Sequence, residues 1–240
     1  MSGKLIVLEG TDGSGKSTQF SLLCQHMEQE NRAFQKLIFP QYQEPSSALL
    51  KMYLNGEFGQ NPSDVNAYAA STFYAVDRYA SWKKVWGADY DNGALILSDR
   101  YSTSNAVHQT GKLPEAEWSG FLDWLFDFEY NKLGLPAPDL VLYLDMPTEK
   151  AVEMLRSRES ATHTKADIHE VTPIISPIAA AWPKRPRSNA VGCVSPAWTQ
   201  TAACARWRIF IKRFGALSAL SLKNKMEGMR HGIHSFGRGL

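Results

Sequence analysis

Short runs of apolar residues, each about as long as a β-strand, recur along the N-terminal part of the chain. They cover residues 4–9, 36–39, 94–98 and 139–144. Continuous apolar runs of this length are typical of strands that are buried on both faces of a sheet. The longer segments between them space their apolar residues as a helix does, over residues 16–30, 64–87 and 114–131. This alternation predicts an α/β fold, with a parallel sheet flanked by helices in a three-layer sandwich.

The turn after the first predicted strand carries the phosphate-loop motif GxxxxGK[ST], in the strand–turn–helix context that the motif requires. The residues expected to bind nucleotide phosphates are Gly10, Thr11, Asp12, Gly13, Ser14, Gly15, Lys16, Ser17 and Thr18. The glycines let backbone N–H groups point at phosphate oxygens, and the following helix N-terminus adds partial positive charge. We expect Lys16 to reach the β- and γ-phosphates of a nucleoside triphosphate and Ser17 to bind Mg²⁺. The motif predicts a P-loop NTPase, but it does not choose between a kinase, a GTPase and an ATPase.

Three further stretches narrow that choice. Phe39-Pro40-Gln41-Tyr42 ends the second predicted strand, and Asp99-Arg100 ends the third, where open α/β sheets bind their ligands. Tyr74 and Arg78 stand one helical turn apart, so their side chains share one face of a helix. Each stretch also has a purely structural reading, as core aromatics, a strand end or a surface ion pair.

Together with the phosphate loop, these stretches make residues 4–170 resemble the thymidylate kinase family. The resemblance implies transfer of the γ-phosphate of ATP to dTMP, which gives dTDP. It implies that Phe39, Pro40 and Tyr42 form a wall of the monophosphate site. It also implies that Tyr74 stacks on thymine and that Arg78 hydrogen-bonds the base.

Further family positions complete the implied site. Asp12 would accept a hydrogen bond from the deoxyribose 3′-OH, and Asn105 would lie near the base. Arg100 would clamp phosphate through its bidentate guanidinium, and Asp99 would hold Mg²⁺ directly or through water. His108 departs from the family, which usually has an aromatic residue near the 2′ edge of the sugar.

The predicted lid spans about residues 156–166, after the helix that follows the fourth strand. By the resemblance, Arg156 and Arg158 close over the ATP phosphates; solvated charges at a helix C-terminus are the alternative. The nucleophile would be an already anionic phosphate oxygen of dTMP, which needs no general base. Catalysis would then rest on positioning and charge neutralisation by Lys16, Mg²⁺, Arg100 and the lid arginines.

Two other functions stay open from the sequence. A deoxynucleoside kinase would phosphorylate a sugar hydroxyl and would need a base such as Glu9 beside it. A nucleic-acid-binding protein would use a basic C-terminal tail, with Trp182, Trp198 and Trp207 stacking on bases. We expect nucleic acid not to be the partner, and dTMP to be the substrate.

Charge divides the chain at about residue 170. Residues 1–170 hold 15 Lys and Arg against 23 Asp and Glu, a net charge of −8. Residues 171–240 hold 11 basic residues and one acidic residue, a net charge of +10. The hydrophobic pattern also dissolves there, and nothing after Val171 resembles the family. We therefore divide the chain into a kinase domain, residues 1–170, and a basic tail, residues 171–240.

A shifted reading frame accounts for this break. Back-translation by one base turns Trp198-Thr199 into an obligatory Asp and Trp182-Pro183 into an obligatory Ala. Residues 204–211 then permit Leu-Arg-Ser-Val-Glu-Asp-Ile-His, which is similar to the end of family chains. We infer a frameshift near residue 170, with a genuine basic tail as the alternative.

The frameshift has structural consequences. We expect residues 171–240 to be poorly ordered and to add no well-packed strand, which leaves an unpaired sheet edge and a poor or inactive enzyme. An ordered tail that packs a strand beside the sheet would contradict this inference.

The remaining expectations concern the setting of the protein. Cys24, Cys193 and Cys204 show no metal-ligand spacing and no disulfide framework, which favours a reducing, cytoplasmic location. No apolar run is long enough to span a bilayer, and we find no signal peptide. The apolar residues of the segments 64–87 and 114–131 exceed what one face would bury, which is compatible with a homodimer.

Overall fold

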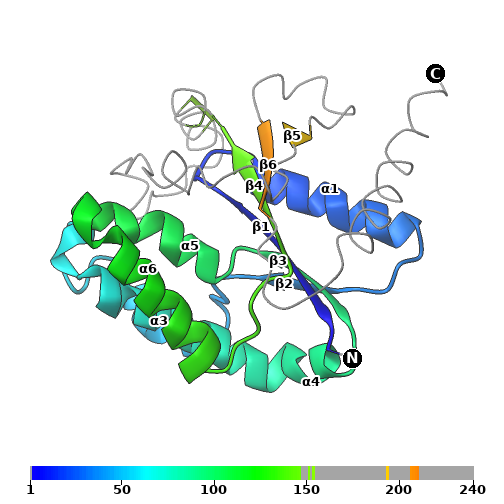
Figure 1. Ribbon diagram of the computed structural model, residues 1–240, viewed down its shortest axis with the longest axis horizontal. Helices are drawn as coiled ribbons and strands as arrows, with labels where there is room; N and C mark the ends of the chain where they lie inside the picture. The colour runs from blue at the N-terminus through cyan, green and yellow to red at the C-terminus, as the bar shows by residue number, and fades with distance from the viewer. Residues whose placement is uncertain (1, 147–150, 152, 155–192, 195–205, 211–240) are drawn as a thin grey trace.

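The computed structural model describes residues 2–146, 151, 153–154, 193–194 and 206–210 (Figure 1). Its sheet has the strand order β2-β3-β1-β4-β6-β5. The strands are β1 (Lys4–Gly10), β2 (Gln35–Ile38), β3 (Leu95–Asp99), β4 (Leu140–Asp145), β5 (Cys193–Val194) and β6 (Arg206–Phe210). All pairings among β1 to β4 are parallel, so the predicted parallel sheet is confirmed.

Helices cover both faces of the sheet. They are α1 (Lys16–Gln29), α2 (Ala48–Leu54), α3 (Ala67–Ser81), α4 (Gly87–Asp91), α5 (Ser102–His108) and α6 (Trp118–Phe126). Figure 1 shows α1 on one side of the strands and α3, α5 and α6 on the other, which gives three layers. Two π-helical turns, Trp82–Trp86 and Asp127–Lys132, continue α3 and α6. They explain why the helical pattern predicted two segments longer than the α-helices themselves.

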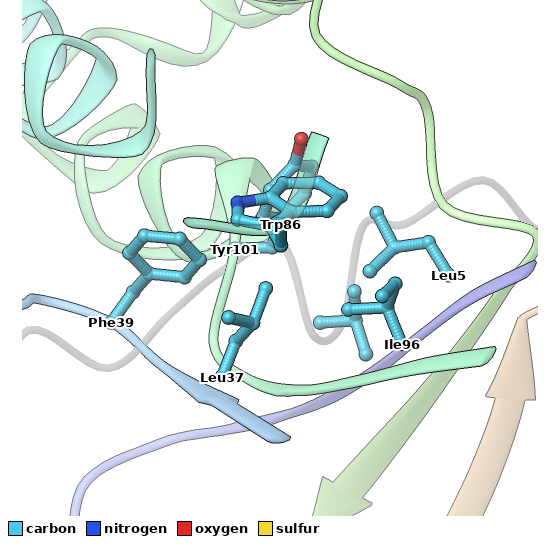
Figure 2. Close-up of a cluster of buried hydrophobic side chains, with 7 residues drawn as sticks. Leu5, Leu37, Phe39, Trp86, Ile96 and Tyr101 are labelled. Atoms are coloured by element: carbon cyan, nitrogen blue, oxygen red, sulfur yellow. The ribbon is translucent and has the colours of Figure 1, made fainter. Parts of the chain in front are cut away.

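The two sheet faces have separate cores because successive strand residues point to opposite sides. On the α1 side, Leu8 packs with Phe20 and Met27. On the opposite side, Leu5 and Ile96 belong to a cluster with a fully buried Trp86. Figure 2 shows this second cluster, in which Leu5, Leu37, Phe39, Trp86, Ile96 and Tyr101 meet. The cluster includes Phe39 and Tyr101, which follow β2 and β3, and so holds the strand ends where the site is built.

The tail adds strands to the sheet, whereas we expected it to add no well-packed strand. The strand β6 pairs antiparallel with β4, from Val141 opposite Phe210 to Asp145 opposite Arg206. β5 pairs in turn with β6. The physical reason is that a strand edge presents unpaired main-chain N–H and C=O groups. Any extended segment can pair with them, regardless of its side chains. The edge of β4 is therefore paired. An ordered tail with a strand beside the sheet would contradict the frameshift, and the strand, one half of this condition, is present.

Several expectations fall outside the described residues. These include the lid, with Arg156 and Arg158, and most of the basic tail, so the order of that tail and nucleic-acid binding stay predictions. Among the helices that the structure describes, none is long and apolar enough to cross a membrane.

Candidate functional site

The phosphate loop joins β1 to α1 through two glycines in the left-handed region of backbone space. Gly13 has a φ of 76° and Gly15, which caps α1, has a φ of 81°. Because side chains other than hydrogen disfavour this region, glycine at these positions sets the shape of the turn. The loop leads directly into α1, so Lys16 and Ser17 stand in its first turn, where unpaired N–H groups and the helix dipole favour anions.

A buried carboxylate lies beneath the loop. Glu9, 1% exposed, accepts a hydrogen bond from the Gly10 backbone N–H at 3.0 Å through Oε1. Its Oε2 accepts from the hydroxyls of Thr103 at 3.0 Å and Ser104 at 2.7 Å. Three donors on one carboxylate therefore tie the phosphate loop to α5.

Arg100 crosses the space between the loop and α5. Its Nη2 pairs with Asp12, and its Nη1 lies 3.1 Å from Nε2 of His108 and 3.9 Å from Oε1 of Glu9. The backbone of Arg100 is left-handed, with a φ of 66°, and its N–H donates to the carbonyl of Leu8 at 2.9 Å. Non-glycine residues persist in this conformation where the surroundings over-determine them, commonly at functional sites.

The charges of the site shift its pKa values. Burial opposes ionisation of Asp12, but Arg100, His108 and Lys16 together hold the pKa of Asp12 well below its usual value. Burial, followed by the nearby Arg100, lowers the pKa of the Lys16 ammonium. Arg100 itself is desolvated, yet Asp12 and Glu9 raise the pKa of its guanidinium. Asp12 and Arg100 are therefore ionised near neutral pH, and Lys16 and Arg100 lie close to the place where phosphates would bind.

The predicted metal ligands fit a magnesium ion. Asp99 is buried, and its Oδ1 has no hydrogen-bond partner among the described residues, as expected of an oxygen that awaits a cation. Ser17 is exposed at the start of α1. No group of three or more His, Cys, Asp or Glu side chains suited to a metal occurs in the described part of the chain. One carboxylate and one hydroxyl suit Mg²⁺, which keeps several waters and binds phosphates.

A cavity of about 200 Å³ opens beside the phosphate loop. All the residues predicted to bind substrate line it: Asp12, Phe39, Pro40, Tyr42, Tyr74, Arg78, Arg100 and Asn105. They come from the loop, from the segments after β2 and β3, and from helices α3 and α5. The cavity also has walls that the substrate prediction did not include, formed by Leu54, Tyr101, Ser104, His108 and Gln109.

Two buried acids support this cavity, and sequence reasoning missed both. Asp77 accepts from the Gln41 N–H at 2.8 Å and from the Ser46 hydroxyl at 2.7 Å, which fixes the loop that carries Tyr42. Glu129 accepts from Nε of Arg78 at 2.7 Å and from Nη2 at 2.5 Å. A buried arginine requires a carboxylate partner, but no local pattern indicates which of the distant acids supplies it.

A glycine-rich phosphate loop, set beside a cavity at the carboxyl ends of parallel strands, defines a P-loop nucleotide-binding enzyme of the α/β class. Residues 8–173 match the family model described as Thymidylate kinase, and the chain belongs to this family.

The chain is similar to a thymidylate kinase of Mycobacterium tuberculosis, with 34% identity over 157 residues, 64% of this chain and 71% of that protein. It is 29% identical over 166 residues to a probable thymidylate kinase of Pyrococcus horikoshii, which covers 68% of this chain and 74% of that protein. A solved thymidylate kinase structure from Candida albicans is 26% identical, with a TM-score of 0.48 over 62% of this chain and 66% of that one. As a member of the family, the chain is an ATP-dependent phosphotransferase.

Gly15→Ala should impair the phosphate loop in a way that a matched glycine substitution does not. A left-handed conformation costs alanine about 1–2 kcal/mol, so we expect Gly15→Ala to lower the free energy of unfolding by about that amount and to weaken ATP binding several-fold. Gly134, with a φ of 69° and no neighbouring atom within 4 Å of an added Cβ, is the control. Urea denaturation and ATP titration of both variants check this, and equal ATP affinity of the two would contradict it.

Proposed function

We propose that this chain transfers the γ-phosphate of ATP to dTMP, giving dTDP, with Mg²⁺ as the metal. The observation that carries the proposal is the cavity beside the phosphate loop, which all eight predicted substrate residues line. Arg100 and Asp12 line that cavity next to the loop. The aromatic Tyr74 lines it from α3 with Arg78, and Asn105 lines it from α5. This distribution suits a nucleotide whose phosphate faces the loop and whose base lies away from it.

The phosphate end supports a monophosphate acceptor. The nucleophile is an oxygen of dTMP that already carries negative charge near neutral pH, so the enzyme needs positive charge and alignment. Lys16 and Arg100, which lie close enough to affect each other's charge, would supply that positive charge. Asp99 and Ser17 would hold Mg²⁺, whose charge neutralises the phosphate oxygens when it is bound. Arg156 and Arg158 are proposed to close over the ATP phosphates.

Glu9 argues against the alternative of a deoxynucleoside kinase. A sugar hydroxyl must lose a proton as it attacks, and a general base must be free to accept that proton. Both carboxylate oxygens of Glu9 already accept hydrogen bonds, from Gly10, Thr103 and Ser104. The carboxylate is thus committed to supporting the loop, which favours an acceptor that needs no base.

An assay of phosphate acceptors tests the proposal. With ATP and Mg²⁺, we expect the protein to release ADP when dTMP is added, slowly if the frameshift has left a poor enzyme, and to release none above background with thymidine, because only dTMP brings an anionic nucleophile. A coupled ADP assay measures both, with dTDP identified by chromatography. Turnover of thymidine without turnover of dTMP would contradict the proposal and favour the deoxynucleoside kinase.

We also propose that the chain acts in the cytoplasm as a homodimer, formed through the exposed side of α3. Tyr68, Val76 and Tyr79 are exposed apolar residues on one side of this helix. Val76→Glu should place a charge in the interface and convert the dimer to a monomer in sedimentation. Val85→Glu is the control, since Val85 is equally exposed, 46% against 45%, in the π-helical turn after α3. A wild type that sediments as a monomer at all concentrations would contradict the dimer.

We propose, further, that residues 1–170 form the kinase domain and that a frameshift near residue 170 produces the basic tail. The family match supports this, because it ends at residue 173 of 240. The strands β5 and β6 meet one half of the condition that would contradict the frameshift, and the remaining residues of the tail lie outside the described ones.

The DNA sequence around codon 170 decides the matter. Restoring the other frame should give a chain with a higher unfolding temperature and higher activity toward dTMP, because the family C-terminus then completes the fold. A restored chain that is no more stable and no more active than the original would contradict the frameshift.

A further inference from the structure

A buried ion pair lies beside the cavity, between Arg78, which lines it, and Glu129. Glu129 and Arg78 are 0% and 2% exposed at their side chains, and they form a bidentate pair through Nε and Nη2 of the arginine. The same carboxylate is 3.4 Å from Nδ2 of Asn105, which also donates to the carbonyl of Ser71 at 3.2 Å. Arg78 and Asn105 line the cavity, whereas Glu129 does not.

These contacts determine which polar atoms remain for a ligand. Nε and Nη2 of Arg78 are engaged, and no hydrogen bond to Nη1 occurs among the described residues. The amide nitrogen of Asn105 faces two acceptors, so its oxygen is the atom left for a ligand. Arg78 and Asn105 therefore offer a ligand the N–H donors of Nη1 and one acceptor, Oδ1 of Asn105.

A donor nitrogen together with an acceptor oxygen matches one edge of thymine. That edge carries the O4 acceptor and the N3–H donor, whereas cytosine reverses both, with an N4 amino donor and an N3 acceptor. A side chain that can rotate or flip its amide could satisfy either base. Discrimination therefore depends on what holds Arg78 and Asn105 in one orientation.

The location of Glu129 supports such a role. It sits in the π-helical turn Asp127–Lys132, and π-turns are frequent at functional sites. Two stacked ring pairs connect the turn to α6. The ring centroids of Phe126 and Tyr130 are 5.6 Å apart, and those of Trp124 and Phe128 are 5.3 Å apart. Burial raises the pKa of Glu129, although Arg78 opposes the shift. The desolvation cost of a buried ion pair offsets the attraction between its charges, so the pair contributes little to stability. A role in positioning would account for the burial of Glu129 and Arg78.

We propose that Glu129 is a positioning residue for base selection: it holds Arg78 and Asn105 so that the cavity accepts thymine and rejects cytosine. This inference rests on the proposed function, since it takes dTMP as the ligand. Glu129 touches neither the base nor the phosphates. It acts by fixing one guanidinium and one amide, and its charge keeps the Asn105 nitrogen turned away from the ligand.

Two variants separate positioning from a merely structural role. Glu129→Gln keeps the shape of the side chain but loses the charge that orients its partners. The double variant Arg78→Met with Glu129→Leu replaces the ion pair by apolar residues of similar size, which is often neutral or stabilising. Glu117→Gln is the matched control. It removes the same charge, but Glu117 is exposed and lies just before α6.

The experiment measures dissociation constants of dTMP, dCMP and ATP by calorimetry, together with thermal unfolding, on the whole chain. We expect Glu129→Gln to weaken dTMP binding at least 10-fold while dCMP and ATP change less than about 3-fold, so that the preference for dTMP shrinks. The double variant should unfold near the wild-type temperature and show no preference between dTMP and dCMP. Glu117→Gln should match the wild type.

Three outcomes overturn the inference. A folded Glu129→Gln variant that keeps the wild-type preference would show that the carboxylate does not select the base. A stable double variant that still prefers dTMP would reduce the pair to a structural role. A wild type that binds both nucleotides equally would leave no preference to explain. A wild type that binds no dTMP at all contradicts the proposed function itself, which distinguishes the two failures.

Discussion

The site depends on one buried carboxylate at the end of β1. Glu9 receives hydrogen bonds from the Gly10 backbone and from Thr103 and Ser104, and so links the start of the phosphate loop to helix α5. The cost of burying a charge is met by these donors and by the nearby Arg100 guanidinium, 3.9 Å away. Arg100 in turn pairs with Asp12 in the loop. The phosphate loop is therefore held from below and from the side before any nucleotide binds, which is the preorganisation that electrostatic catalysis requires.

A second arginine lines the same cavity beside a carboxylate. Arg100 lies against Glu9 and Asp12, and Arg78 lies against Glu129. The two arginines differ in exposure, since the Arg100 side chain is 22% exposed and that of Arg78 is 2% exposed. This difference suits the roles proposed above, because an accessible guanidinium can meet a phosphate and an enclosed one keeps its carboxylate. One residue type would thus serve charge neutralisation at Arg100 and fixed geometry at Arg78.

Much of the fold and site could be predicted from the sequence, because each part had a local signal. The β1 to β4 strands were read within about a residue of their ends from their apolar runs. The phosphate loop was evident from spacing alone, and the eight cavity residues came from the family resemblance. Glu129 and Asp77 had no such signal, since their roles arise from contacts with distant residues that only the folded chain brings together. The same holds for β6, whose pairing with β4 depends on main-chain groups that every sequence carries.

The pairing of β6 with β4 bears on the origin of the tail. An antiparallel strand can be added to an open edge by backbone hydrogen bonds alone, so β6 shows that the edge of β4 is used but carries little information about which sequence evolved to use it. The strands β1, β3 and β4 differ from β6 in this respect. They are parallel, and the connections between them contribute helices and core residues. The family match ends at residue 173, well before β6 begins at Arg206. Strand pairing at this edge is therefore compatible with either reading frame, and the evidence that separates them lies in the side chains that a fully formed domain would have to bury.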